Sequence, residues 1–385
     1  MSAPFIARHL ISAPPSRILR HASFGGGGMA WADIQAICSN EFVRLVAVAE
    51  VDMSRLEALK ARFPEAKVYQ DWRELLDKEG KDIDSVNVGT PDHMHAPIAM
   101  SAMQLGKHAY IQKPLAHDIH EVRQLTEVAR QKNLVTQMGI QIHSQKAYRS
   151  AVALIQQGAI GKVREVHSWS GKKWGSEKPM PPGGDPIPEG FNWDLWLGVC
   201  AERPFIGNGY YHPSNWRRRL DFGTGTFGDM GCHIYDPVFE ALALTAPKTV
   251  RSEGPPPSGS DWSTDAVVRY LFPGTKFTEG PSVAVTWYDG SKRPPADVLA
   301  LAPVPPPPEP KSDGTGKKQK RQKGGMPDQG SIFIGTKGTM LLPHIGMPKL
   351  FPVADFKDYP MPDVPDIHHW TEWAEACVEI GRAHV

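Results

Sequence analysis

The sequence lacks both a long apolar stretch and an excess of one charge. No run of residues approaches the roughly 18–20 apolar residues that cross a bilayer. The 43 Lys and Arg residues nearly balance the 42 Asp and Glu residues, which gives a formal net charge of +1. Because no general positive field attracts nucleic acid or an anionic membrane, we expect neither as a partner and expect a small molecule instead.

Cysteine is also scarce. The four cysteines (Cys38, Cys200, Cys232 and Cys377) have neither CxxC spacing nor the density of a disulfide scaffold. They are typical of reduced thiols in a cytoplasmic protein. Residues 1–17 are expected to form an N-terminal tail whose apolar patch is too short for a signal-peptide core, although a trimmed export signal is the alternative.

The first part of the chain has the pattern of a doubly wound α/β domain. From residue 18 to 143, short β-branched runs alternate with segments of helical periodicity. This alternation predicts parallel βαβ units with helices on both faces of the sheet, as in a Rossmann domain. We expect strands at 18–24, 43–49, 84–89, 108–111 and 134–138, and helices at 29–38, 53–62, 94–105 and 118–132.

The remainder, residues 144–385, has the pattern of an α+β domain. One helix is predicted at 146–157, and the strand-like segments are 163–174, 262–273, 282–288 and 331–342, the last as two strands around a turn. We therefore expect a mostly antiparallel, open-faced sheet with helices, through which the chain forms a homo-oligomer. Residues 303–325 are rich in Pro and then Lys, which predicts an exposed insertion, either simply solvated or in contact with an acidic partner.

A glycine-rich turn follows the first predicted strand. In the segment FGGGGMAW at 24–31, Gly25, Gly27 and Ala30 match the GxGxxG/A spacing, and Gly28 belongs to the same turn. Such a turn lets the backbone approach a pyrophosphate, which the N-terminus of the next helix then binds. Four consecutive glycines alone fit a flexible turn equally well.

An acidic residue at the end of the second strand strengthens the prediction of a dinucleotide-binding site. Glu50 lies 20 residues after Ala30 and directly follows the predicted strand at 43–49. A carboxylate there accepts hydrogen bonds from the adenosine ribose and repels a 2′-phosphate, which favours NAD over NADP. Asp52 could share this role or cap the following helix.

A longer motif resembles a known family. Residues 89–118 contain Thr90-Pro91, His95, Gly106-Lys107-His108 and Gln112-Lys113-Pro114. This order and spacing resemble the Gfo/Idh/MocA family of dehydrogenases, over about residues 18–377. The resemblance implies NAD(P)-dependent chemistry on a sugar or polyol. It also implies that the cofactor is contacted by Thr90, Pro91, His95 and Gln112.

The chain departs from the family pattern in three places. Gln112 stands where the family commonly has Glu, so this position carries no charge. The insertion at 303–325 is unusual. The chain also stops soon after residue 377, and residues 378–385 do not resemble the family's continuation, so we expect a truncated C-terminus.

Three residues are the catalytic candidates. Lys113 follows a predicted strand, and a partly desolvated amine at that position can stabilise the negative charge that develops on an alkoxide. Without the motif, Lys113 would be interpreted as an ordinary surface lysine. The resemblance implies an Asp and a His four residues apart on a helix, supplied by Asp229 and His233. His233 would be the general acid or base, with Asp229 orienting it or binding a substrate hydroxyl. The alternative for this pair is helix capping and a surface contact.

The substrate candidates come from aromatic and polar residues. Aromatic faces with polar tips suit sugar rings but also fill cores. We expect substrate contacts from Gln141, Tyr211, His212, Trp216 and Arg217. The arginines at 217–219 could meet an acidic sugar, a second subunit or only solvent. His93 and His95 provide half a metal site at most, so no metal is expected.

We therefore predict an NAD(P)-dependent oxidoreductase that moves hydride between a sugar or polyol carbon and nicotinamide. This prediction requires that Lys113 and His233 lie close together beside one dinucleotide, although they come from different halves of the chain. One alternative is an NAD-dependent glycosidase that oxidises its substrate transiently. Another is a non-catalytic sugar-binding protein.

Overall fold

The computed structural model describes residues 18–305 and 325–378, in two compact units. The first unit contains residues up to Gly139, then Pro186–Glu202 and the chain from Trp370, and the second contains Ile140–Asp185 and Arg203–His369. The division thus differs from the single boundary expected between residues 143 and 144, because two later segments pack with the first unit. The expected tail at 1–17, most of the insertion at 303–325 and the final residues 379–385 lie outside the described residues.

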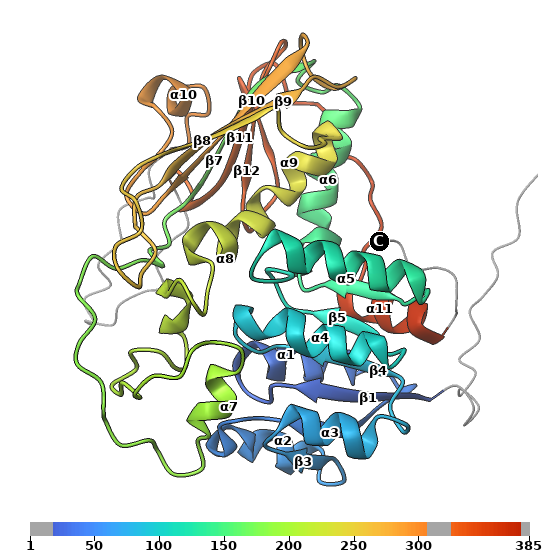
Figure 1. The fold of residues 1–385 in the computed structure, drawn as a ribbon. Helices are drawn as coiled ribbons and strands as arrows, with labels where there is room; N and C mark the ends of the chain where they lie inside the picture. The colour runs from blue at the N-terminus through green and yellow to red at the C-terminus, as the bar shows by residue number, and fades with distance from the viewer. Residues whose placement is uncertain (1–17, 306–324, 379–385) are drawn as a thin grey trace, which may run out of the picture. The chain divides into compact units, whose positions relative to one another are not determined.

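A six-stranded parallel sheet forms the centre of the first unit, in the order β3-β2-β1-β4-β5-β6. This confirms the predicted Rossmann topology, with the strand order reversing between β1 and β4 (Figure 1). The strands are β1 (Leu19–Phe24), β2 (Val43–Ala49), β3 (Lys67–Tyr69), β4 (Ser85–Val88), β5 (His108–Ile111) and β6 (Thr136–Met138). The short β3 was not predicted.

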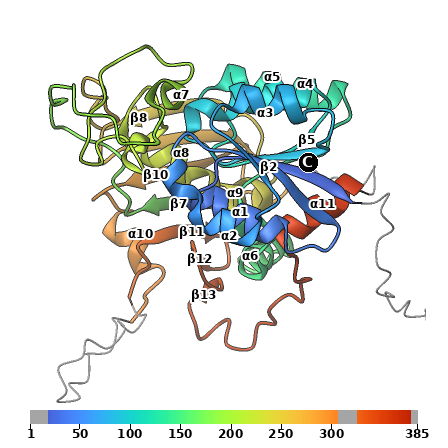
Figure 2. The same cartoon turned by 90° about the horizontal axis from the view of Figure 1, so that it is seen from below.

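Helices cover both faces of this sheet (Figure 2). Leu75, Ile98 and Leu125 pack on one face, and Ile34, Ile37 and Trp373 pack on the other. The first face therefore carries α3 (Trp72–Glu79), α4 (His95–Gln104) and α5 (Ile119–Gln131), and the second carries α1 (Gly28–Ile37), α2 (Glu57–Arg62) and α11 (His369–Val378). The unit also contains η2 (Met53–Leu56), η3 (Asp92–Met94) and α7 (Trp193–Leu197).

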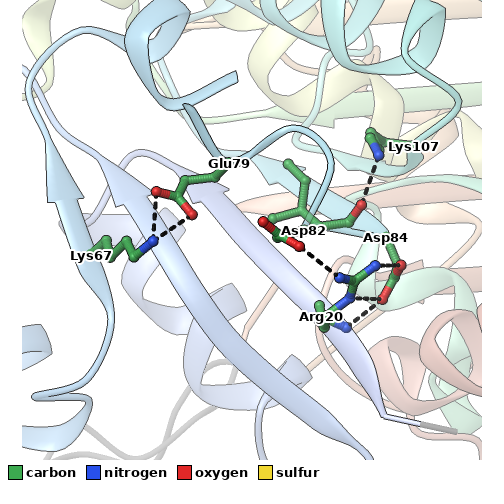
Figure 3. Close-up of polar contacts among 7 residues, drawn as sticks. Arg20, Lys67, Glu79, Asp82, Asp84 and Lys107 are labelled. Carbon is green, nitrogen blue, oxygen red and sulfur yellow. Dashed lines mark hydrogen bonds and ion pairs between the residues drawn. The ribbon is translucent and has the colours of Figure 1, made fainter. Parts of the chain in front are cut away.

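Polar contacts fix the amino ends of the strands (Figure 3). The Arg20 guanidinium of β1 donates to both carboxylate oxygens of Asp84, at 2.8 and 3.0 Å. Lys107 Nζ donates to the carbonyl of Ile83 at 2.8 Å, and its burial lowers its pKa. Lys107 belongs to the family-like motif, yet it lies at the edge of the sheet opposite the glycine turn. Its contact is therefore structural.

The second unit is built on a seven-stranded sheet in the order β13-β12-β11-β7-β10-β9-β8. Every pairing is antiparallel except that of β7 with β10, which confirms the expected mostly antiparallel sheet. The strands are β7 (Val163–Ser170), β8 (Thr249–Glu253), β9 (Val267–Pro273), β10 (Ser282–Asp289), β11 (Gln329–Gly335), β12 (Thr339–Pro343) and β13 (Lys349–Phe351).

The helices of the second unit include the one predicted to carry Asp229 and His233. They are η4 (Gln141–Ser144), α6 (Lys146–Gln156), η5 (Asn215–Arg218), α8 (Gly225–Ile234), α9 (Asp236–Leu242) and α10 (Ala296–Ala300). Helix α8 contacts β7 and β11 near the middle of the sheet, and α6 packs along α9. Within the described part of the chain, no helix has both the length and the apolar character needed to span a bilayer.

Candidate active site

The glycine turn after β1 has the geometry that a dinucleotide requires. Gly25 has a φ of +99°, which other residues rarely adopt. A Cβ added to Gly89, after β4, would lie 2.6 Å from the Cβ of Ala30, so α1 begins unusually close to the sheet. No side chain caps the start of α1 at Gly27. The backbone N–H groups of Gly28 and its neighbours therefore suit a pyrophosphate.

Glu50 lies at the carboxyl end of β2 and closes the turn. Its Oε2 accepts from Gly26 N at 2.8 Å, and its Oε1 accepts from Asp52 N at 3.0 Å. Asp52 caps η2 by accepting a hydrogen bond from Ser54 N, which is the second of the two roles considered for it, helix capping. A carboxylate oxygen has two acceptor sites, so each Glu50 oxygen retains one for a ribose hydroxyl.

Arg55 was missed by the sequence reasoning. A Cβ added to Gly27 would overlap Arg55 Nε, and one added to Gly28 would lie 3.1 Å from its Nη2. The guanidinium therefore lies against the glycine turn, where it would supply positive charge to a cofactor phosphate. The sequence did contain a signal for Arg55, because it is a basic residue that follows the second strand and Glu50 closely.

His95 joins the loops that follow β4 and β5. Its Nδ1 hydrogen-bonds the carbonyl of Pro114 at 2.7 Å, and its Nε2 hydrogen-bonds the carbonyl of Thr90 at 2.8 Å. The ring is only 1% exposed. Thr90 and Pro91 thus lie at the carboxyl edge of the sheet, while both ring nitrogens of His95 contact backbone carbonyls.

Gln112 is held by a buried carboxylate. Its Nε2 donates to Asp33 Oδ2 at 2.8 Å, while its Oε1 accepts from Lys113 N at 3.2 Å. Trp370 Nε1 donates to the other Asp33 oxygen at 2.9 Å. Burial raises the pKa of Asp33 to about 7, against the lowering effect of these two hydrogen bonds. The amide at 112 therefore links α1 to the residue that carries the predicted catalytic amine, and Lys113 itself is half-buried beyond β5.

His93 belongs to a different set of contacts from His95. Its Nε2 hydrogen-bonds the carbonyl of Trp196 at 3.1 Å, and the two rings lie 5.6 Å apart. This contact holds segment 186–202 within the first unit. In residues 18–305 and 325–378, no group of three or more His, Cys, Asp or Glu side chains is placed to hold a metal ion.

In the second unit, α8 carries both predicted polar residues. Asp229 and His233 are 7% and 6% exposed and lie four residues apart, hence on one face of the helix. Asp229 Oδ2 accepts from Trp174 Nε1 at 2.7 Å, and its Oδ1 accepts from Arg217 Nε at 3.2 Å. The structure therefore brings Arg217 and Asp229 together and adds Trp174, which the sequence reasoning missed.

His233 lies beside a second histidine that was also missed. The rings of His233 and His344 are 5.4 Å apart. Both line a small, partly open pocket, together with Tyr148, Gln145 and Ser331. Since His344 follows β12, far along the chain from α8, no local pattern pointed to it.

The remaining substrate candidates occupy mixed environments. Tyr211 is 2% exposed and packs edge-on against Phe222, with ring centroids 5.4 Å apart. Trp216 is also buried and donates to the carbonyl of Pro213 at 3.1 Å. His212 and Gln141 are half-buried. Tyr211 and Trp216 thus serve the core, and Trp216 also stacks under Arg217, whose Cζ lies 4.2 Å from its ring centroid.

Comparison with known proteins identifies both parts of the chain. Residues 19–140 match the Gfo/Idh/MocA model described as an oxidoreductase family with an NAD-binding Rossmann fold, and residues 157–283 match the family's C-terminal alpha/beta domain. Levoglucosan dehydrogenase of Pseudarthrobacter phenanthrenivorans is 29% identical over 189 residues, covering 49% of this chain and 40% of that protein. An alpha-N-acetylgalactosaminidase of Shewanella oneidensis is 28% identical over 160 residues, covering 39% and 34% respectively. The matched stretch thus spans two fifths or less of these relatives.

Solved structures share the fold. GenD2 from gentamicin A biosynthesis, in complex with NAD, has a TM-score of 0.61 at 17% identity, covering 99% of this chain and 91% of that one. The WlbA dehydrogenase of Bordetella pertussis, in complex with NADH and UDP-GlcNAcA, has a TM-score of 0.62 at 14% identity, covering 96% and 90%. With two matched domain models that together span well over half of its residues, the chain belongs to the Gfo/Idh/MocA family of oxidoreductases, and its first unit contains that family's NAD-binding Rossmann domain.

Proposed function

We propose that this protein is an NAD(P)-dependent dehydrogenase that transfers hydride between a CH–OH carbon of a sugar or polyol and nicotinamide. The observation that carries the proposal is the His95 link between the loops after β4 and β5. Through it, the loop that bears Lys113 is fixed at the same sheet edge as the glycine turn. Alcohol oxidation needs a hydride acceptor and a group that stabilises the developing negative charge, and this sheet edge offers a binding turn for the first and an amine for the second.

Each candidate residue has a distinct role. NAD, when bound, supplies the hydride acceptor. The Lys113 amine hydrogen-bonds the reacting oxygen and stabilises its developing negative charge. His233 removes or returns the hydroxyl proton, because imidazole titrates near neutral pH. Asp229, oriented by Trp174 and Arg217, accepts a hydrogen bond from a neighbouring substrate hydroxyl.

The proposal is tested by cofactor reduction. Purified full-length protein is mixed with NAD and a panel of sugars, polyols and sugar acids, and NADH is followed by absorbance. Lys113→Ala should abolish turnover while NAD still binds, as measured by calorimetry. The exposed Lys132, changed to Ala, is the matched control. Full turnover by Lys113→Ala would contradict the assigned role.

The preferred cofactor is NAD. Glu50 supports this choice, because its buried carboxylate at the turn would repel a 2′-phosphate. Calorimetric titration of both cofactors tests it, and tighter binding of NADP would overturn it. Arg55 supplies charge for the phosphates of either cofactor.

A glycosidase that oxidises its sugar transiently is the second candidate. It is favoured by the relative named as an alpha-N-acetylgalactosaminidase. This activity releases an aglycone from a chromogenic glycoside without accumulating NADH. Release of the chromophore at constant NADH absorbance would replace the first proposal with the second.

The protein is further proposed to be a cytoplasmic homo-oligomer. The outer strands of the second sheet support the oligomer, since Val250 of β8 and Leu271 of β9 expose 56% and 36% of their surface. Light scattering coupled to gel filtration tests it, and Val250→Glu with Leu271→Glu should dissociate the assembly. The four cysteines, which form no disulfide within the described residues, support the cytoplasm. Fractionation of the producing cells tests this location.

A further inference from the structure

Three cationic side chains surround one indole in the second unit. Trp174 lies in the segment after β7. Its ring centroid is 5.6 Å from Arg217 Cζ, 5.6 Å from Arg218 Cζ and 5.8 Å from Lys172 Nζ. A tryptophan face attracts cations and holds them in place at distances up to about 6 Å. We refer to Lys172, Trp174, Arg217 and Arg218 as the Trp174 cluster.

The neighbouring Arg219 takes no part in the cluster. Its guanidinium pairs with Asp261 at 2.5 Å, and the side chains of the two residues are 8% and 1% exposed. It also lies 3.6 Å from the centroid of the Tyr210 ring. This arginine is therefore neutralised inside the core, and the run of three arginines divides into one structural residue and two members of the cluster.

Negative charge does not balance the cluster. Its carboxylate is Asp229, whose two oxygens already receive Trp174 Nε1 and Arg217 Nε. Among the described residues, Arg218 and Lys172 have no acidic partner. The Nε of Arg218 is also buried without a hydrogen-bond partner there. A buried donor left in this state costs about 1–3 kcal/mol, so an acceptor supplied from outside would recover that energy.

We propose that the Trp174 cluster binds the anionic group of the substrate, which is a sugar that carries a carboxylate or a phosphate. The inference rests on the proposed function, because it names the class of sugar that the dehydrogenase accepts. Guanidinium groups match both anions with two parallel hydrogen bonds. Because Trp174 also donates to Asp229, the anion would be recognised beside the carboxylate proposed to bind a hydroxyl.

Calorimetry on the full chain with NAD present tests the proposal. The probes are D-glucuronate, D-gluconate, D-glucose 6-phosphate and inorganic phosphate, each compared with D-glucose. We expect at least one anionic probe to bind about tenfold or more tightly than glucose, which corresponds to about 1.4 kcal/mol. Preference for glucuronate or gluconate identifies the carboxylate, and preference for either phosphate probe identifies the phosphate. Equal binding of all probes overturns the proposal.

Variants locate the binding group. Arg218→Met should remove the preference for the anion, and Arg218→Lys should retain part of it through the remaining charge. Arg164 pairs with Glu279 on the surface at β7, so Arg164→Met is the matched control and should bind as the wild type does. Thermal melting confirms that each variant is folded. An unchanged preference in Arg218→Met contradicts the proposal.

The outcomes separate this inference from the proposed function. Oxidation of neutral sugars that is insensitive to Arg218→Met retains the dehydrogenase and overturns the anion site. Binding of an anion that depends on Arg218, with no oxidation of any sugar, retains the anion site and overturns the dehydrogenase.

Discussion

His95 and Pro114 are joined by a hydrogen bond of 2.7 Å between the imidazole Nδ1 and the proline carbonyl. Because the same ring also bonds the carbonyl of Thr90, two loops separated by a helix and a strand become one rigid edge. Lys113 directly precedes Pro114. The histidine of this motif therefore supports the backbone next to Lys113.

Replacing His95 with Asn should therefore reduce catalysis more than cofactor binding. Asn cannot span both carbonyls, so the Lys113 loop loses its support, and misplacement by about 1 Å costs on the order of 10²-fold in rate. We expect kcat to fall while the Kd for NAD changes little. His120, exposed on α5, provides the control as His120→Asn. Equal losses in kcat and NAD affinity would indicate collapse of the nucleotide site instead.

The Asp33–Gln112 hydrogen bond explains why position 112 carries an amide and not a carboxylate. Gln112→Glu would replace the Nε2 donor by a carboxylate oxygen facing Asp33 Oδ2, now 2.8 Å away. At pH 8, above the Asp33 pKa of about 7, two carboxylates then face each other without a proton between them. Loss of the buried donor should lower the free energy of unfolding at this pH by about 1–3 kcal/mol, measured in urea. Adding Asp33→Asn to that variant restores a donor and should recover stability. A single variant as stable as the wild type would show that the contact is dispensable.

The pH dependence of stability provides a test of Asp33. Burial raises the pKa of Asp33 to about 7, compared with about 3.9 for an unfolded aspartate. Between these values the folded protein holds a proton that the unfolded chain releases. Its contribution to stability is therefore complete below about pH 4 and is lost as the pH rises to about 7, at up to about 1.4 kcal/mol per pH unit.

Asp33→Asn removes this titration. Urea unfolding at pH 5, 6, 7 and 8 should show a smaller decline in the variant than in the wild type, whatever the difference at any single pH. Asp118, exposed at the start of α5, gives the comparison variant Asp118→Asn. Parallel pH curves for wild type and Asp33→Asn would place the pKa of Asp33 near its ordinary value.

The predictable part of the fold is the part written in local patterns. The run Val43–Ala49 is apolar except for Arg44, and it forms β2 with the predicted bounds. The unpredicted α3 had a recoverable signal, since Asp71 caps it and Leu75 and Leu76 face the core. The sequence carries no local signal that segment 186–202 belongs to the first unit. Its place there depends on contacts such as that of His93 with Trp196, which are 103 residues apart.

The same distinction applies to the candidate site. The glycine spacing located the turn, and the Lys-Pro motif made Lys113 a candidate, because in both cases neighbouring residues carry the pattern. Asp33 could not be predicted from the sequence, because a single aspartate within an apolar helix forms no pattern. Its role depends on the hydrogen bonds from Gln112 and Trp370, which only the fold brings close. Trp174 and His344 were missed for the same reason, because each meets its partner through the fold and not through the sequence.

His344 is the residue whose removal best tests the environment of His233. The two rings lie 5.4 Å apart and line one pocket, so the ring of His344 packs beside the candidate base. His344→Gln keeps a polar side chain but removes that ring contact. If His233 is the base, kcat should fall because its imidazole is held less firmly in place, and misplacement by about 1 Å costs on the order of 10²-fold in rate. The Kd for NAD, measured by calorimetry, should change little. The exposed His368→Gln is the control and should leave kcat unchanged. An unchanged kcat in His344→Gln would show that the contact is dispensable for catalysis, and an equal loss in both variants would point to a general loss of folded protein.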